Sequence, residues 1–220
     1  MNSNKLKKLS GDASFRFFFR KKNLKNSSVF VYCKKKKNNN LVIYDAINNI
    51  LIKNNLLAPK LISQNYSKNY IEIEDFGDLT LLKHLRKKKI NKLNCYKKLI
   101  LILNQLQKIK IKKIQTFLKK NYEIPNYSNK ILLDESNLFL KWYLPKFIEG
   151  NEKNILKKKI IKILKNLLKR LIYKKKVFVH RDYHVSNIMI TKKGYGIIDS
   201  QDALFGNVAY DLASLIDDVR

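Results

Sequence analysis

The first third of the chain places apolar residues in short runs whose alternation has the period of β-strands. The runs at 14–20, 28–33 and 70–74 are rich in aromatic and β-branched residues, which favour strands. Between the last two runs, residues 41–57 have apolar positions at helical spacing and stop before Pro59, a residue that disfavours helix in its predecessor. We therefore expect a small sheet accompanied by one helix.

After a turn at 75–78 the apolar spacing becomes mainly helical. Helices are predicted at 80–87, 93–119, 137–148, 155–174 and 209–219. Short strands are predicted at 177–179, 188–190 and 196–198. The change of period divides the chain into a strand-rich N-lobe (1–78, hinge near 74–78) and a helical C-lobe with a small internal sheet (79–220).

Composition narrows the classes of protein. Hydrophobic residues make up 45% of the 220, as in folded proteins. The N-terminus lacks a secretory apolar run, and the apolar-rich helices are too interrupted by polar residues to span a bilayer. The two cysteines, Cys33 and Cys95, lie far apart in sequence. These features favour a reduced, cytoplasmic setting and no membrane partner.

The formal net charge of +30 raises the question of nucleic-acid binding. The lysines instead recur on the polar faces of amphipathic helices, as at 155–174. The sequence contains no zinc knuckle, helix-turn-helix or aromatic-rich single-strand platform. We expect no specific nucleic-acid partner, and a monomer.

One loop carries the chemistry. His180 and Asp182 precede Asn187 at the H-R-D-x-x-x-x-N spacing, and Asp199 follows the next strand-like segment. Phosphoryl transfer needs a carboxylate to orient the attacking hydroxyl, and an amide and a second carboxylate to hold Mg²⁺ on the nucleotide phosphates. The spacing predicts Asp182 as catalytic base and Asn187 and Asp199 as metal ligands. Together with the change from strands to helices, this motif predicts a bilobal, α+β, protein-kinase-like fold that uses ATP and Mg²⁺.

Other residues are expected to support or surround this loop. His180, His184 and Asp211 are predicted to brace it. The H-x-D-x-H-x-x-N form, with no activation-loop signature after the acid, favours small-molecule phosphotransferases over protein kinases. Asp202 is placed near the metal or the substrate.

The segment 11–20 occupies the place of the glycine-rich loop that covers the nucleotide phosphates, although it has a single glycine. Its backbone N–H groups, Ser14 and the basic residues Arg16 and Arg20 are candidates for phosphate contacts. An ordinary edge hairpin is the alternative for this segment.

Several blocks together resemble the bacterial N-acetylmuramate/N-acetylglucosamine anomeric kinases, members of the aminoglycoside phosphotransferase superfamily used in peptidoglycan recycling. These blocks are GDASFRFFFR, IEDFGDLTLL, LFLKWYL, VFVHRDYHVSNIMI and GIIDSQDALFGNVAYDLASLIDDVR. The resemblance implies transfer from ATP·Mg²⁺ to the anomeric hydroxyl of an N-acetylated amino sugar. It places Asp182, Asn187 and Asp199 in the roles given above. It also sets Glu74, Asp75 and Phe76 beside the adenine, and turns Glu135 and Trp142 toward the sugar.

Three departures from the family pattern stand out. Ser200 takes the place of a usual phenylalanine, which predicts looser packing behind Asp199. The third strand ends in Tyr32-Cys33, so the resemblance names no lysine for the nucleotide phosphates. The sequence stops at Arg220, where the family continues with further helices, so we expect a C-terminally truncated relative.

Two alternatives stay open. One keeps the chemistry and changes the acceptor to an aminoglycoside, choline or another sugar. The few acids of the helical region (Asp134, Glu135 and Glu149) lack the clustering that a cationic aminoglycoside requires. The other is a degenerate kinase homologue that binds nucleotide or RNA without turnover.

Overall fold

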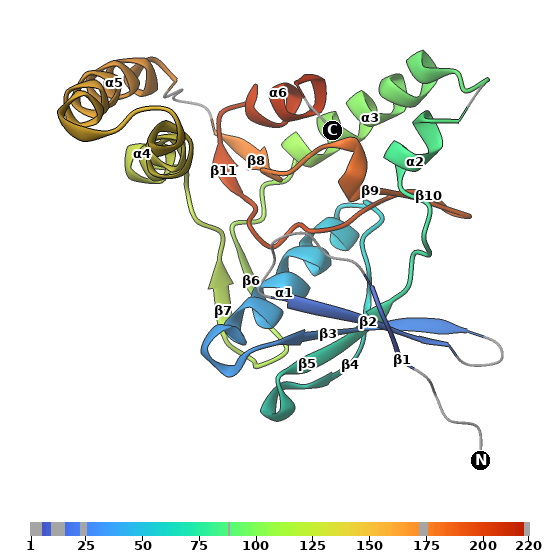
Figure 1. Cartoon of the computed structure of the whole chain (residues 1–220). Helices are drawn as coiled ribbons and strands as arrows, with labels where there is room; N and C mark the ends of the chain where they lie inside the picture. The colour runs from blue at the N-terminus through green and yellow to red at the C-terminus, as the bar shows by residue number, and fades with distance from the viewer. Residues whose placement is uncertain (1–5, 10–15, 23–25, 88, 172–175, 218–220) are drawn as a thin grey trace.

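The protein's N-terminal region is an antiparallel sheet, shown in the computed structural model of Figure 1. The residues that the structure describes are 6–9, 16–22, 26–87, 89–171 and 176–217. The sheet has five strands in the order β1-β2-β3-β5-β4. Their bounds are Leu6–Lys8 (β1), Arg16–Lys22 (β2), Ser27–Cys33 (β3), Leu61–Asn65 (β4) and Tyr70–Glu74 (β5).

Helix α1 (Asn39–Lys53) lies between this sheet and the rest of the molecule (Figure 1). Toward the sheet it buries Leu41 and Tyr44 in a cluster with Val31 and Ile71. Its other apolar residues, among them Ile47, belong to the larger core of the C-terminal part. Because one helix is packed on both sides, it couples the sheet to the segments around the predicted catalytic loop.

The C-terminal part is mainly helical. Its α-helices are Leu81–Leu85 (α2), Lys92–Gln107 (α3), Asn129–Leu138 (α4), Gly150–Arg170 (α5) and Tyr210–Ile216 (α6). Three small antiparallel pairs complete it: Lys113–Gln115 with Asn121–Glu123 (β6, β7), Val177–Val179 with Leu204–Gly206 (β8, β11), and Ile188–Thr191 with Gly194–Ile197 (β9, β10). No helix within the described ranges has the length and apolarity to cross a bilayer.

The predicted α+β, kinase-like fold class is confirmed, while several element bounds were wrong. The helix predicted at 93–119 ends at Gln107, and the chain continues through the alternating Ile109 and Ile111 into β6. The helix predicted at 137–148 is a π-helix (Phe139–Tyr143) followed by a 3₁₀ turn (Leu144–Lys146) that contains a proline at its start. β-Branched alternation and proline outweigh helical spacing at these places.

The strand predicted at 14–20 is described only from Arg16 onward. Ser14, a predicted phosphate contact, belongs to 10–15, which lie outside the described residues. The division into lobes at 78 and 79 stays a prediction.

Candidate active site

The predicted catalytic loop connects β8 to β9. It leaves β8 at Val179, passes through a 3₁₀ turn (Val185–Asn187) and enters β9 at Ile188. Arg181 has a left-handed backbone conformation, with φ at 78°. This conformation costs a non-glycine residue of order 1–3 kcal/mol, and it persists only where surrounding contacts hold it. The loop therefore requires specific contacts to keep its shape.

Asp211 supplies those contacts from the first turn of α6. Its carboxylate accepts hydrogen bonds from the backbone N–H of His180 (2.7 Å) and of Arg181 (3.0 Å). Its side chain is buried, and burial raises the pKa of this carboxyl to about 7, against the lowering effect of the two N–H donors. The loop is thus anchored on α6 at the residue with the unusual backbone.

The two histidines of the loop lie inside it. His180 is fully buried, and its Nε2 is 3.2 Å from the carbonyl oxygen of Ile198. Burial lowers the pKa of His180 to about 4, so the ring is neutral at pH 7 and Nε2–H donates to that carbonyl. His184 is also buried, with its Nε2 3.3 Å from Nδ2 of Asn187. His184 thus contacts the predicted metal ligand Asn187, and His180 contacts the residue before the other predicted ligand, Asp199.

Asp182 presents an exposed carboxylate at the turn of the loop. Partial desolvation raises the pKa of this carboxyl, and the negative charge of Asp199 raises it further. Nδ2 of Asn187 donates to the Asp182 carbonyl (3.1 Å), and the N–H of Ile198 donates to the Asn187 carbonyl (3.0 Å). The predicted base, amide and second acid therefore lie at one place.

Asp199 follows β10 and also has a left-handed backbone, with φ at 64°. Its Oδ1 is 2.6 Å from Nη2 of Arg16, the first residue of β2. The Arg16 side chain is 5% exposed and that of Asp199 38% exposed, so the pair joins a buried cation from the sheet to an acid at the edge of solvent. Sequence reasoning missed this pair, which spans 183 positions.

The donor set fits Mg²⁺. Asn187 and Asp199 offer an amide and a carboxylate oxygen, and a cationic guanidinium already lies on the carboxylate. Mg²⁺ takes few protein ligands and keeps waters and phosphate oxygens for the rest. Within the described ranges no three His, Cys, Asp or Glu side chains converge as a metal cage. The arrangement suits a metal shared with a nucleotide.

The segment predicted to lie beside the adenine is fixed by Arg20. Its guanidinium makes 2.6 Å contacts with Asp75 and Asp78 and donates to the carbonyl oxygen of Gly77 (2.9 Å). The pKa of Asp75 is lowered, because hydrogen bonds from Arg20 and its neighbours outweigh the opposing effect of burial. The guanidinium of Arg20 thus lies on these partners, and its expected phosphate contact stays a prediction.

The neighbouring hinge residues have different surroundings. The Glu74 carboxylate lies 3.4 Å from Nζ of Lys193. The ring of Phe76 packs against Gly196, where an added Cβ would come within 2.5 Å of Cε2. The Asp75 carboxylate is held by Arg20, and the place of Glu74, Asp75 and Phe76 beside the adenine stays a prediction.

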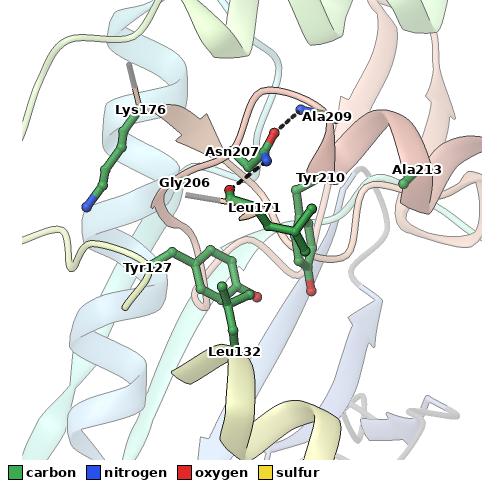
Figure 2. Close-up of a pocket in the computed structure, with 9 residues that line it drawn as sticks. All are labelled: Tyr127, Leu132, Leu171, Lys176, Gly206, Asn207, Ala209, Tyr210 and Ala213. Atoms are coloured by element: carbon green, nitrogen blue, oxygen red, sulfur yellow. Dashed lines mark hydrogen bonds between the residues drawn. The ribbon is translucent and has the colours of Figure 1, made fainter. Parts of the chain in front are cut away.

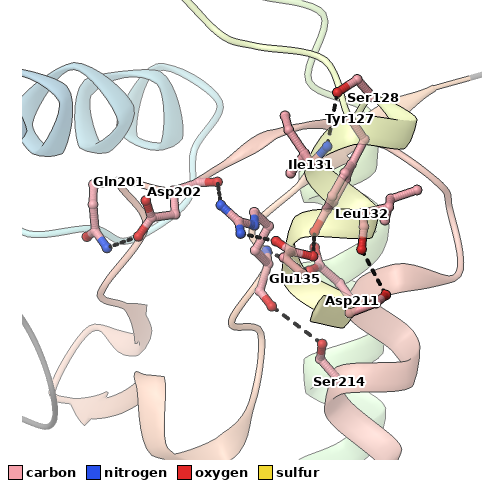
Figure 3. A network of polar contacts seen from close by, with 11 residues as sticks. Tyr127, Ser128, Ile131, Leu132, Glu135, Gln201, Asp202, Asp211 and Ser214 are labelled. Atoms are coloured by element: carbon pink, nitrogen blue, oxygen red, sulfur yellow. Dashed lines mark hydrogen bonds and ion pairs between the residues drawn. The ribbon is translucent and has the colours of Figure 1, made fainter. Parts of the chain in front are cut away.

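The residues predicted to face the acceptor separate into two groups. Glu135 forms an ion pair with Arg181 and accepts a 2.7 Å hydrogen bond from the Tyr127 hydroxyl, as Figure 3 shows. Asp202 has an exposed side chain, accepts from Gln201 (2.7 Å), and its carbonyl accepts from Arg181 (3.4 Å). Both therefore surround Arg181, and substrate contact by either stays a prediction.

Trp142 lies apart from that network. It sits in the π-helix with 65% of its surface exposed and with Nζ of Lys141 5.3 Å from its ring. Among the described residues no hydrogen bond or ring contact joins it to the catalytic loop. Its predicted place beside a sugar is untested.

A hollow of about 210 Å³ lies near Tyr127 and Tyr210, and Figure 2 shows its lining. The lining is largely aromatic and aliphatic, and it includes none of Asp182, Asn187 and Asp199. The candidate site therefore does not coincide with this hollow.

Ser200, the departure expected to loosen the packing behind Asp199, makes a polar contact with α1. It is fully buried, and its Oγ donates to Oδ1 of Asn48 on α1 (2.8 Å). Asn48 in turn donates to the carbonyl of Pro59 (3.1 Å). A hydrogen bond to α1 thus lies where the family pattern has a phenylalanine side chain. Nothing in the local sequence signals a partner 152 positions away.

Comparisons with curated proteins identify kinases as relatives of this chain. An N-acetylmuramate/N-acetylglucosamine kinase of Neisseria meningitidis serogroup B is 28% identical over 214 residues, covering 95% of this chain and 60% of that protein. A kinase of the same description from Pseudomonas aeruginosa is 26% identical over 209 residues, covering 95% and 58%. The chain thus spans about 60% of the length of the curated relatives it matches.

Solved structures show the same fold. The gentamicin complex of APH(2'')-IIa has a TM-score of 0.67 at 19% identity, covering 97% of this chain and 70% of that one. The ADP-bound aminoglycoside phosphotransferase APH(2'')-Ib has a TM-score of 0.65 at 17% identity, covering 97% and 71%. The sequence profile described as the phosphotransferase enzyme family matches residues 55–220. The chain belongs to the phosphotransferase enzyme family.

Proposed function

We propose that this chain transfers the γ-phosphoryl group of ATP to the anomeric hydroxyl of N-acetylmuramate or N-acetylglucosamine. The observation that carries the proposal is the grouping of Asp182, Asn187 and Asp199 around one loop and the hairpin that follows it. Two relatives with that kinase description match over 95% of the chain. A nucleotide donor is supported by the ADP-bound neighbour of the same fold.

In this proposal Asp182 acts as the base. Its exposed carboxylate accepts the proton of the acceptor hydroxyl, and a raised pKa makes it a better proton acceptor than an ordinary aspartate. Asn187 and Asp199 would hold Mg²⁺, which supplies charge neutralisation on the transferring phosphoryl group. His180, His184 and Asp211 keep the loop in place, since Asp211 accepts from the two N–H groups that begin it.

The proposal includes a setting. Phosphorylation of an amino sugar from ATP belongs with peptidoglycan recycling in the cytoplasm, and a monomer of two lobes, 1–78 and 79–220, is its simplest form. The net charge of +30 is distributed over solvated helix faces, so specific nucleic-acid binding is not part of it.

An aminoglycoside is the main alternative acceptor, and the Glu135 ion pair argues against it. A polycationic acceptor needs carboxylates that are available to its ammonium groups. Glu135 already shares its carboxylate between Arg181 and the Tyr127 hydroxyl. An uncharged or anionic amino sugar avoids that competition.

The test is the variant Asp182→Asn, assayed with both amino sugars, choline and an aminoglycoside. We expect kcat to fall by about 10²- to 10⁴-fold, the usual contribution of a positioned base, while the affinity for Mg·ADP is retained. Asp217→Asn, at the exposed end of α6, is the matched control and keeps full activity.

Three outcomes would count against parts of the proposal. Full turnover by Asp182→Asn would refute the mechanism. A folded wild-type protein that binds Mg·ADP and phosphorylates choline or an aminoglycoside, but no amino sugar, would refute the acceptor. Binding of nucleotide without turnover of any acceptor would favour a degenerate kinase homologue, and steeply salt-dependent RNA binding would support its RNA-binding form.

A further inference from the structure

The third strand of the sheet lacks the cation that kinase-like sites place there. In protein kinases a lysine on this strand holds the nucleotide phosphates. Here β3 reads SSVFVYC, without a basic residue. The lysines that follow, Lys34–Lys37, are exposed at the end of the strand. A site that binds ATP needs a cation from elsewhere.

Arg16 lies where such a cation is needed. It is the first residue of β2, is 7% exposed, and pairs in register with Cys33, the last residue of β3. Its guanidinium carbon is 5.4 Å from the centre of the Tyr44 ring on α1 and 5.8 Å from that of Phe18. The side chain thus passes under the sheet, between β3 and α1, toward the C-terminal part.

The end of that path is the predicted metal site. Nη2 of Arg16 is 2.6 Å from Oδ1 of Asp199. A metal bound by Asp199 would also touch the nucleotide phosphates, so a guanidinium at this distance is within reach of the same phosphates. Arginine stays charged and matches phosphate oxygens with two parallel N–H donors, so it suits this role.

We propose that Arg16 is the phosphate-anchoring cation of this site in place of a β3 lysine, and that its pair with Asp199 is the nucleotide-free arrangement. When Mg²⁺ and nucleotide bind, Asp199 changes partner to the metal and Arg16 to a phosphate. The inference rests on the proposed nucleotide-dependent function but not on any acceptor.

The exchange has a physical reason. A buried guanidinium without an anionic partner is costly, and so is an unpaired carboxylate close enough to repel the charge of Asp182. In the nucleotide-free protein each of the two groups neutralises the other. A divalent cation alone would have to displace Arg16 and leave it without an anion, whereas Mg²⁺ with a phosphate supplies partners for both. We therefore expect metal and nucleotide to bind with strong mutual dependence.

The decisive variant is Arg16→Met, which keeps an unbranched apolar stem and removes the charged guanidinium. Three ligands are titrated by calorimetry: adenosine, Mg·ADP, and Mn²⁺ alone. We expect Mg·ADP affinity to fall by about tenfold or more, the size of one charge-assisted hydrogen bond. Adenosine affinity stays unchanged. Mn²⁺ alone binds more tightly than to the wild type, because Asp199 has lost its competing cation. Arg16→Lys, with the charge kept, falls between the two.

Asp199→Asn tests the same exchange from the other side and covers the case in which Arg16→Met does not fold. It releases Arg16 from its partner, so ADP without metal should bind this variant more tightly than the wild type, while the gain from adding Mg²⁺ disappears. Equal losses for adenosine and Mg·ADP in Arg16→Met would overturn the proposal. So would unchanged Mg·ADP binding, or metal-free ADP binding to Asp199→Asn that is no tighter than to the wild type. These readouts involve no acceptor sugar, so failure of the sugar assay leaves them interpretable.

Discussion

At the scale of single residues, the site depends on buried polar groups whose partners lie on other segments. His180 and Asp211 have no solvent contact to compensate a lost bond, and both hold the loop that carries Asp182. Such groups are costly to disturb because a buried donor or acceptor without a partner loses its hydration with no return. The chemistry of the loop is therefore tied to its stability.

His180 gives this a pH dependence. Burial lowers its pKa from 6.5 to about 4, so between these values the unfolded chain binds a proton that the native state does not. Stability from this group is fully present above pH 6.5 and is lost as the pH falls toward 4. His180→Gln removes that titration, so its deficit relative to the wild type should narrow on acidification, by at most roughly 3 kcal/mol.

The measurement is urea unfolding of both proteins at pH 7.5, 6, 5 and 4.5. Taking the difference cancels every other titrating group, including Asp211, whose raised pKa acts in the opposite direction. A difference that stays constant across this range would show that His180 is not held neutral by burial.

At the scale of elements, the contact between Phe76 and β10 fixes the hinge segment against the catalytic hairpin. Gly196 in β10 lies under the ring, and an added Cβ would be 2.5 Å from Cε2 and 2.7 Å from Cδ2. Gly196→Ala should therefore destabilise the protein by roughly 1–3 kcal/mol, the usual cost of overpacking.

The matched design is a double-mutant cycle with Phe76→Leu, measured by chemical unfolding. The smaller side chain removes the ring atoms that the new methyl would meet, so the double variant should recover part of the loss. Additive effects of the two substitutions would mean that the cost of Gly196→Ala arises from the strand backbone and not from Phe76.

Local sequence patterns predict those parts of the structure that depend on residues close together in the chain. The strands at 70–74 and 177–179 and the order of the catalytic loop are predictable, because alternation and motif spacing are local signals. The ties Arg16–Asp199 and Ser200–Asn48 join positions 183 and 152 residues apart. No local signal encodes such pairings, so the partner of Arg16 and that of Ser200 emerge only in three dimensions, although Arg16 itself is a phosphate candidate from the sequence.

At the scale of the whole molecule, a net charge of +30 on 220 residues opposes the compact state through self-repulsion. Raising the salt concentration shortens the range of this repulsion, from a Debye length of about 30 Å at 0.01 M to about 8 Å at 0.15 M. We expect the free energy of unfolding to rise over this interval. Chloride and sulfate at matched ionic strength separate screening from anion binding, since pure screening gives equal gains.

One surface bears on that measurement. Phe139, Tyr143 and Phe147 follow α4 as a row of exposed rings, with centroids 5.0 and 4.7 Å apart. Screening the charge also allows such a row to associate between molecules. Sedimentation at each salt concentration therefore accompanies the unfolding curves, and a fall in stability of a still monomeric protein at higher salt would contradict the prediction.

The ion pairs of Arg16, Arg20 and Arg181 affect how substitutions in this chain can be interpreted. Six of the 47 basic residues are arginine, and three of these six are Arg16, Arg20 and Arg181. Each of the three forms an ion pair with a carboxylate, and the side chains of Arg16 and Arg20 are buried. Lysine serves at nearly every solvated position, where a point charge is enough. The sequence thus uses lysine where a single charge is enough, and it keeps arginine at the three ion-paired positions, where a planar guanidinium is required.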